Sequence, residues 1–199
     1  MGNPSTRESI LKEARSCFAN LGFVGTSLND IAAEVGIKRP SLMHHFNSKE
    51  HIYLEVLAES LGDWGARVNS SVDVSLQGWD LVDAVLKSSY EFFSANPEVV
   101  KIFGREAISP NVLNGARIGQ ILRPFFQRAV AFLQTEMDAG RLRRHDAENL
   151  IVTGYGSLLT YFSDAELLEQ LIGSDPLTDA ALKNRFNHLR AFFSAALEP

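Results

Sequence analysis

The sequence predicts an all-α protein of about nine helices. Apolar residues recur at spacings of three and four along most of the chain, which is the period of a helix with one buried face. No run alternates convincingly with a period of two, so no strand is expected. Gly and Pro residues fall between the periodic segments, where helices usually begin and end.

The first helix is predicted over residues 7–21, and Gly22 is expected to end it. Its apolar side chains form one stripe: Ile10, Leu11, Ala14, Cys17, Phe18 and Leu21. Cys17 is the only cysteine, so the chain has no internal disulfide. Because Cys17 lies on the apolar stripe, we expect it to be buried as a small apolar residue.

Two short helices joined by a tight turn are predicted within residues 27–46. Thr26 and Ser27 precede the first of them and can cap its free N–H groups. Gly36 follows it, where a left-handed residue ends a helix at least cost. One face of this first short helix is apolar: Leu28, Ile31, Ala32 and Val35.

The second short helix is expected to begin at Arg39 and Pro40, because proline is tolerated only in the first turn of a helix. Arg39 precedes that proline and is expected at the cap position. Leu42 and Phe46, four residues apart, are expected to anchor this helix to the first.

Six further helices are predicted after residue 48. Asn47 or Ser48 should cap the first of them, with Glu50 in its electropositive first turn. A break is expected at residues 109–111, and the long helix is expected to kink or be interrupted at Pro124. The expected ranges are 49–68, 79–95, 98–107, 113–139, 146–162 and 178–197. We expect a small domain over residues 1–50 and a larger one over residues 51–199.

The charge is distributed unevenly between these two parts. Residues 1–50 hold six basic and five acidic side chains, a net charge of +1, whereas residues 51–199 hold thirteen and nineteen, a net charge of −6. This asymmetry favours the N-terminal part as a surface for nucleic acid.

Other classes of protein find little support in the sequence. No segment is long and apolar enough to span a bilayer, and the N-terminus lacks the apolar core of a signal peptide, so a cytoplasmic location is expected. The five histidines form no His-x-x-x-His pair, and no nucleophile motif is present. We therefore expect no metal, no cofactor, no catalytic residue and no enzymatic activity.

Six side chains at and around the second short helix cannot all face the core of so small a unit: Lys38, Arg39, Ser41, Met43, His44 and His45. A helix is ~10–12 Å across, which fits a DNA major groove ~12 Å wide. The arrangement is typical of a helix-turn-helix, in which the second helix contacts the bases.

Residues 7–50 resemble the DNA-binding domain of the tetracycline-repressor (TetR) family of bacterial regulators. The similarity runs through residues 10–18 and 21–27, then Asp30-Ile31-Ala32-Ala33-Glu34-Val35-Gly36-Ile37, and then residues 45–50. It implies an N-terminal three-helix DNA-binding domain followed by a C-terminal helical domain for ligand binding and dimerisation.

A DNA interface follows from the helix-turn-helix and the resemblance. Arg39 could contact a guanine, Ser41 a base edge or a phosphate, and the two histidines either group. Thr26, Ser27 and Lys49 are expected to contact the DNA backbone, Lys49 because the resemblance implies a backbone-contacting lysine there. The predicted interface is Thr26, Ser27, Asn29, Lys38, Arg39, Pro40, Ser41, Met43, His44, His45 and Lys49.

The resemblance also implies a small-molecule inducer held by the C-terminal helices. Sixteen of the nineteen aromatic residues follow residue 50, so an apolar cavity is possible there, although packing in the core is the alternative for each aromatic. The charged candidates could instead be solvated surface side chains. The candidates are Trp64, Trp79, Phe92, Phe103, Arg105, Glu106, Arg123, Phe126, Tyr155 and Phe162.

The last two expected helices carry apolar faces wider than a monomer usually exposes. We expect them to form a four-helix bundle with a second copy of the chain. The predicted interface residues are Tyr155, Leu158, Phe186, Leu189 and Phe193.

The sequence therefore predicts a homodimeric transcriptional regulator that binds a palindromic operator in double-stranded DNA. A repressor is favoured over an activator, because a dimer seated on an operator blocks polymerase without further contacts. The alternative is a ligand-binding or protein-interaction module whose helix-turn-helix no longer binds DNA.

Overall fold

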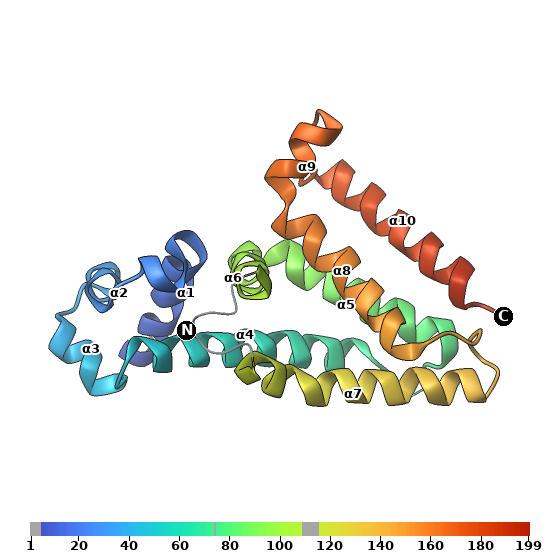
Figure 1. Ribbon diagram of the computed structural model, residues 1–199, viewed down its shortest axis with the longest axis horizontal. Coiled ribbons are helices and arrows are strands. Elements are labelled where there is room, and N and C mark those ends of the chain that lie inside the picture. The colour runs from blue at the N-terminus through green and yellow to red at the C-terminus, as the bar shows by residue number, and fades with distance from the viewer. Residues whose placement is uncertain (1–4, 74, 109–115) are drawn as a thin grey trace. The chain divides into compact units, whose positions relative to one another are not determined.

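The computed structural model describes residues 5–73, 75–108 and 116–199. Over these residues the chain forms ten helices and no strand, so the expected all-α fold is confirmed (Figure 1). The helices are α1 (Thr6–Gly25), α2 (Leu28–Val35), α3 (Arg39–His45), α4 (Lys49–Ser71), α5 (Gly78–Ala95), α6 (Pro97–Ile108), α7 (Ala116–Asp138), α8 (Ala147–Ser163), α9 (Ala165–Ile172) and α10 (Asp179–Leu197).

The chain divides into two compact units. Unit 1 comprises Met1–Asp63 with Glu98–Ile118, and unit 2 comprises Trp64–Pro97 with Gly119–Pro199. Helices α4 and α7 contribute residues to both units. The division expected after residue 50 falls at the start of α4, and a boundary at that position stays a prediction.

Unit 1 has a closed apolar core. The stripe expected on α1 is buried except for Leu21, and Ile31 of α2, Leu42, Phe46 and Ile52 of α4 are fully buried against it. Gly22 does not end α1 but interrupts it, with φ 73° and ψ 171°, before the chain returns to helical geometry as far as Gly25. Glycine adopts such a positive φ without the steric strain that a Cβ atom introduces.

Helix α6 completes this core from far along the chain. Ile102 is 1% exposed within the unit 1 core, and Phe103 packs against the same cluster. Arg105 Nη2 donates to the carbonyl of Asn20 at 3.0 Å, and the Tyr53 hydroxyl donates to Glu106 Oε1 at 2.5 Å. These contacts tie α6 to α1 and α4 within unit 1.

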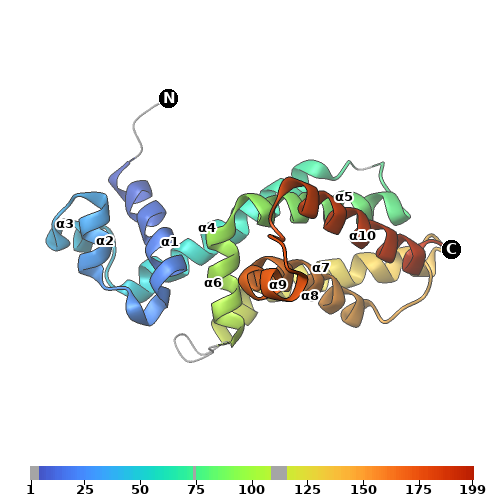
Figure 2. The same ribbon diagram turned by 90° about the horizontal axis from the view of Figure 1, so that it is seen from above.

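Unit 2 is organised around α5, which contacts both α8 and α10 (Figures 1 and 2). The ring of Tyr90 on α5 lies 5.2 Å from the rings of both Phe162 on α8 and Phe186 on α10. Its hydroxyl donates to the carbonyl of Leu182 at 2.8 Å. A single aromatic side chain thus joins the three helices.

A buried carboxylate holds the ends of α5 and α7 together. Glu136 is 5% exposed and accepts hydrogen bonds from Gly78 N–H at 2.7 Å and from Arg141 at 2.6 and 2.7 Å. The pKa of Glu136 lies below its ordinary value of 4.5 because the Arg141 guanidinium donates to the charged form, although burial opposes this shift.

The later helices depart from expectation in two places. The eight-residue helix α9 was not expected. Asp164 is both the C-cap of α8 and the N-cap of α9, and Gly173 caps the end of α9 with φ 79°. Pro124 lies inside α7 without interrupting it. The break expected at residues 109–111 lies outside the described residues, as does the expected start of the long helix at residue 113.

Candidate nucleic-acid interface

The turn between α2 and α3 is built from local backbone chemistry. Ser27 caps α2: its Oγ accepts from Asp30 N–H at 3.2 Å, and the Asp30 carboxylate accepts from Ser27 N–H at 2.8 Å. Hydrogen bonding of the Asp30 carboxylate to the Ser27 side chain and to the Ser27 N–H holds the pKa of Asp30 below its ordinary value. Gly36 ends α2 in the left-handed region with φ 76°, and its N–H donates to Ala33 O at 3.0 Å.

Helix α3 begins at Arg39, as the proline predicts, but its cap is Lys38. The expectation that Arg39 occupies the cap position is wrong. Lys38 has the extended backbone of a cap (φ −82°, ψ 147°), and its carbonyl accepts from Ser41 and Leu42 N–H at 2.9 and 3.2 Å. Arg39 and Pro40 therefore occupy the first turn, where the missing N–H of proline is no loss.

Two fully buried residues attach α3 to the rest of unit 1. Leu42 and Phe46 are each 0% exposed, and the Phe46 ring meets the ring of His51 at 5.5 Å. The Arg7 guanidinium lies over the Phe46 ring, 5.2 Å from its centroid. The orientation of α3 is therefore fixed by its buried side rather than by its outer side.

The outer side of α3 is polar and open to solvent. Lys38, Arg39, Ser41, His44 and His45 are exposed, together with Pro40, and Met43 is 37% exposed. Figure 2 shows α3 and α2 side by side, joined by the short turn. We call the seven residues 38–41 and 43–45 the α3 outer face.

The side chains of Thr26 and Lys49, which were expected to contact DNA, form hydrogen bonds within unit 1. Thr26 is 2% exposed, and its Oγ1 donates to Gly22 O at 2.8 Å and Cys17 O at 3.2 Å. Lys49 Nζ donates to Phe23 O at 2.7 Å and Thr26 O at 2.8 Å, and it lies 4.2 Å over the Phe23 ring. Both side chains hold the junction of α1, α2 and α4 together.

The beginning of α2 and of α4 present further polar groups. Ser27 and Asn29, at the start of α2, are exposed. Ser48 caps α4 through His51 N–H at 3.1 Å, which confirms one of the two expected caps. The pKa of Glu50 is lowered by the backbone N–H at this helix start and by the Ser48 hydroxyl.

The ten ligand candidates do not form one group within a compact unit. Phe103, Arg105 and Glu106 belong to unit 1, and the other seven belong to unit 2. In unit 2, Phe92 is 5% exposed, and Trp64 Nε1 donates to Ser89 Oγ at 3.1 Å. Trp79, Phe126 and Phe162 are half-buried, whereas Arg123 and Tyr155 are exposed.

The expected dimer residues are divided between the interior and the surface of unit 2. Leu158, Leu189 and Phe193 are 8%, 3% and 5% exposed, so they pack inside a single chain. Phe186 is half-buried against Tyr90, and Tyr155 is 48% exposed. The other large apolar side chains exposed on these two helices are Val152 (56%) and Phe192 (54%).

Sequence reasoning missed two features of unit 2. Val152 and Phe192 continue the apolar pattern of their helices, but helical period alone does not say which of two apolar sides faces outward. A polar cavity beside α5 was also missed, and none of the ten ligand candidates lines it. Its only sequence signal is the spacing of Asp80, Asp83, Lys87 and Glu91 along one side of the helix.

No described helix is long and apolar enough to cross a membrane. Within the same residues, no group of three His, Cys, Asp or Glu side chains is placed to hold a metal ion.

The anchored α2–α3 pair with its polar α3 outer face defines a helix-turn-helix DNA-binding unit. Comparison with known proteins leads to the same class. Residues 10–56 match the bacterial regulatory proteins of the tetR family. The HTH-type transcriptional repressor KstR2 of Rhodococcus jostii (strain RHA1) is 33% identical over 105 residues, which are 53% of this chain and 52% of that protein. The match thus spans about half the length of this relative.

The similarity extends to longer matches and to solved structures. The HTH-type transcriptional regulator RutR of Escherichia coli (strain K12) is 24% identical over 168 residues, 84% of this chain and 79% of that protein. The structure of the ketosteroid transcriptional regulator KstR2 of Mycobacterium tuberculosis superposes with a TM-score of 0.77 at 21% identity, covering 100% and 97% of the two chains. Residues 10–56 thus match the DNA-binding part of the tetR family of bacterial regulatory proteins, and the chain as a whole has the fold of the solved KstR2 regulator.

Proposed function

We propose that this protein is a transcriptional repressor that binds a palindromic operator as a homodimer and is released by a small-molecule inducer. The observation that carries the proposal is the α3 outer face. Its side chains are exposed, while Leu42 and Phe46 on the opposite side are fully buried. A short helix held in this way can enter a major groove without unfolding any part of its own core.

The proposed contacts follow from the chemistry of each exposed group. Arg39 donates to guanine O6 and N7, and Lys38 neutralises a phosphate. Ser41, His44 and His45 hydrogen-bond to base edges or phosphates, and Pro40 and Met43 supply apolar contact. Ser27 and Asn29, at the start of α2, contact the DNA backbone. Thr26 and Lys49 are left out of the proposed interface because their polar atoms are bonded inside unit 1.

The proposed dimer uses the exposed apolar side chains of α8 and α10. Val152 and Tyr155 on α8 and Phe192 on α10 are each about half exposed. Two copies related by a two-fold axis would cover these side chains and present two α3 helices to successive turns of DNA, ~34–36 Å apart. Leu158, Leu189 and Phe193 support this surface from within the chain.

Repression and release are the finer parts of the proposal. The relative from Rhodococcus jostii is itself named a repressor. The proposed inducer lies among aromatic side chains of unit 2, with Trp64, Trp79, Phe92, Phe126 and Phe162 as the candidates. A thermal-shift screen with fatty acids, aromatic acids and cationic drugs tests this part, and stabilisation by no ligand class counts against it.

The same proposal places the protein where the chromosome lies, which is the cytoplasm of a bacterium. It includes no catalytic role, because binding and release account for regulation without any chemical step. DNA, an inducer and a second copy of the chain are its partners.

The test is a fluorescence-anisotropy titration with duplex DNA from upstream of the protein's own gene. Wild type should bind this duplex more tightly than a scrambled one of equal length. The double variant Lys38→Ala/Arg39→Ala should lose most of that preference, while Lys183→Ala, an exposed lysine on α10, should keep it. A folded dimer that binds neither duplex would instead indicate a protein-interaction module.

A further inference from the structure

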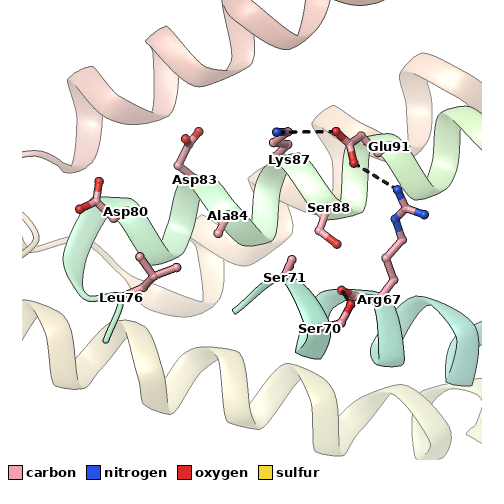
Figure 3. Close-up of a pocket in the computed structure, with 10 residues that line it drawn as sticks. All are labelled: Arg67, Ser70, Ser71, Leu76, Asp80, Asp83, Ala84, Lys87, Ser88 and Glu91. Carbon is pink, nitrogen blue, oxygen red and sulfur yellow. Dashed lines mark hydrogen bonds and ion pairs between the residues drawn. The ribbon is translucent and has the colours of Figure 1, made fainter. Parts of the chain in front are cut away.

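A polar cavity of about 630 Å³ lies between the last turns of α4 and one side of α5 (Figure 3). Arg67, Ser70 and Ser71 line it from α4. Its volume falls within the range of small-molecule sites, ~300–1,000 Å³, and eight of its ten lining residues are polar or charged, all except Leu76 and Ala84. All of its lining residues belong to unit 2.

One lining hydroxyl is buried without a hydrogen-bond partner. Ser88 is 4% exposed, and its Oγ bonds to no group in the described part of the chain. In Figure 3 the Ser88 side chain points from α5 into the space toward Ser71. Ser70 and Ser71, by contrast, donate to main-chain carbonyls of α4 at 2.8 Å. A buried hydroxyl that lacks a partner in the protein can form a hydrogen bond with a ligand atom.

The two ends of the cavity differ in charge. At one end Arg67 and Lys87 share the single carboxylate of Glu91, at 3.1 and 4.0 Å, which leaves that end positive (Figure 3). At the other end Asp83 is paired with Arg190 of α10 at 2.6 Å. Asp80 has no ionic partner among the described residues, so this end carries a negative charge.

The distance between these ends limits what can bridge them. Asp80 and Lys87 are seven residues apart on one helix, which is ~10 Å along its axis. The two charges of an α-amino acid are too close together to reach both ends. Ala84 lies between the ends on α5 and offers apolar contact to a short methylene chain.

We propose that this cavity binds an elongated zwitterion, an amino acid whose ammonium and carboxylate groups are separated by a chain of several methylenes. The ammonium pairs with Asp80, the carboxylate is held by Arg67 and Lys87, and Ser88 Oγ completes its hydrogen bonding on the ligand. A dicarboxylate is repelled at the Asp80 end, and a diamine is repelled at the Arg67 end. This site is separate from the aromatic candidates for the inducer, and binding to it does not depend on release from DNA.

Isothermal titration calorimetry of the full chain, without DNA, tests the proposal with γ-aminobutyrate, δ-aminovalerate and ε-aminocaproate. At least one of these should bind at one site per chain, about tenfold or more tighter than adipate and hexamethylenediamine at the same ionic strength. If no zwitterion binds, or if the three charge types bind alike, the proposal is overturned.

Two variants locate the site. Asp80→Asn should weaken binding of the best zwitterion about tenfold. The variant should then bind this zwitterion about as weakly as it binds the carboxylate of equal chain length that lacks the ammonium group. Ser88→Ala should weaken it by a smaller factor. Glu169→Gln removes an exposed charge from α9 and should leave binding unchanged. Binding that is insensitive to Asp80→Asn in a protein with wild-type circular dichroism would overturn the assignment, and the ligand selectivity of wild type tests it independently of any variant.

Discussion

The two units differ in how completely they bury their apolar side chains. Among the described residues of unit 1, the exposed large apolar side chains are Leu21 and Val24 at the end of α1 and the partly exposed Met43 on the otherwise polar α3 outer face. Unit 2 leaves large apolar side chains exposed on each of its last three helices, including Val152, Leu171 and Phe192. The polar outer face of unit 1 suits contact with a charged, hydrated surface, whereas the exposed apolar side chains of unit 2 favour contact with a second apolar surface.

The largest effect should come from breaking the core that supports the α3 outer face. Phe46→Ala removes a ring that is 0% exposed and should lower the free energy of unfolding by about 3–5 kcal/mol. Urea unfolding followed by circular dichroism measures the loss. His44→Ala, on the exposed side of the same helix, should change the unfolding midpoint very little, and equal losses in the two variants would show that α3 is not anchored as described.

Substitutions on the exposed apolar side of unit 2 should weaken dimerisation rather than folding. Val152→Glu with Phe192→Glu should raise the dimer dissociation constant ~100-fold or more, because each change places a charge in a covered interface. Sedimentation velocity at micromolar concentration measures it. Unfolding of the monomer should be little affected, since both side chains are already exposed in one chain. A double variant that remains a dimer would move the interface elsewhere.

The features of this contrast that depend on residues close together in the sequence could be predicted, whereas those that depend on distant residues could not. Ser27, Gly36 and Pro40 act on groups three or four residues away, so the two short helices and their turn were predictable. Ile102 joins the unit 1 core from α6, and no local pattern signals that contact. The inward side chains of Thr26 and Lys49 depend on the three-dimensional path of α1, which neither the local sequence nor the resemblance behind the expected Lys49 contact describes. In α8 and α10, the helical period identified the apolar residues. It did not show which of them are buried within one chain and which remain exposed.

The buried carboxylate of unit 2 should make stability depend on pH. The pKa of Glu136 is lowered in the folded protein, so its contribution is complete above its ordinary value of 4.5 and is lost as the pH falls through the folded-state value. Glu136→Gln should lower the free energy of unfolding by about 1.5–3 kcal/mol at pH 7. Urea unfolding at pH 7 and at pH 4 compares the two proteins. The difference should shrink at the lower pH, and a difference that grows there would contradict the role given to Arg141.

The smallest predicted effects separate two lysines of unit 1. Lys49→Ala removes two hydrogen bonds to carbonyls and should lower the free energy of unfolding by about 1–2 kcal/mol, below the upper range for charged groups because Lys49 is half-buried. Lys38→Ala should leave stability within about 0.5 kcal/mol of wild type but reduce the salt dependence of DNA binding by about one phosphate contact. Thermal unfolding and salt titrations measured on both variants sharpen the contrast. A lower salt slope for Lys49→Ala than for Lys38→Ala would reverse it.

The measurement that tests the central claim most directly is the selection of binding sites from random duplex DNA with wild type and with Arg39→Ala. If the α3 outer faces of a two-fold dimer contact the bases, wild type should enrich inverted repeats with half-site centres one helical turn, ~34–36 Å, apart. Arg39→Ala should then lose the base preference at one position in each half-site. Enrichment of a single unrepeated sequence, or a repeat that Arg39→Ala leaves unchanged, would contradict the account.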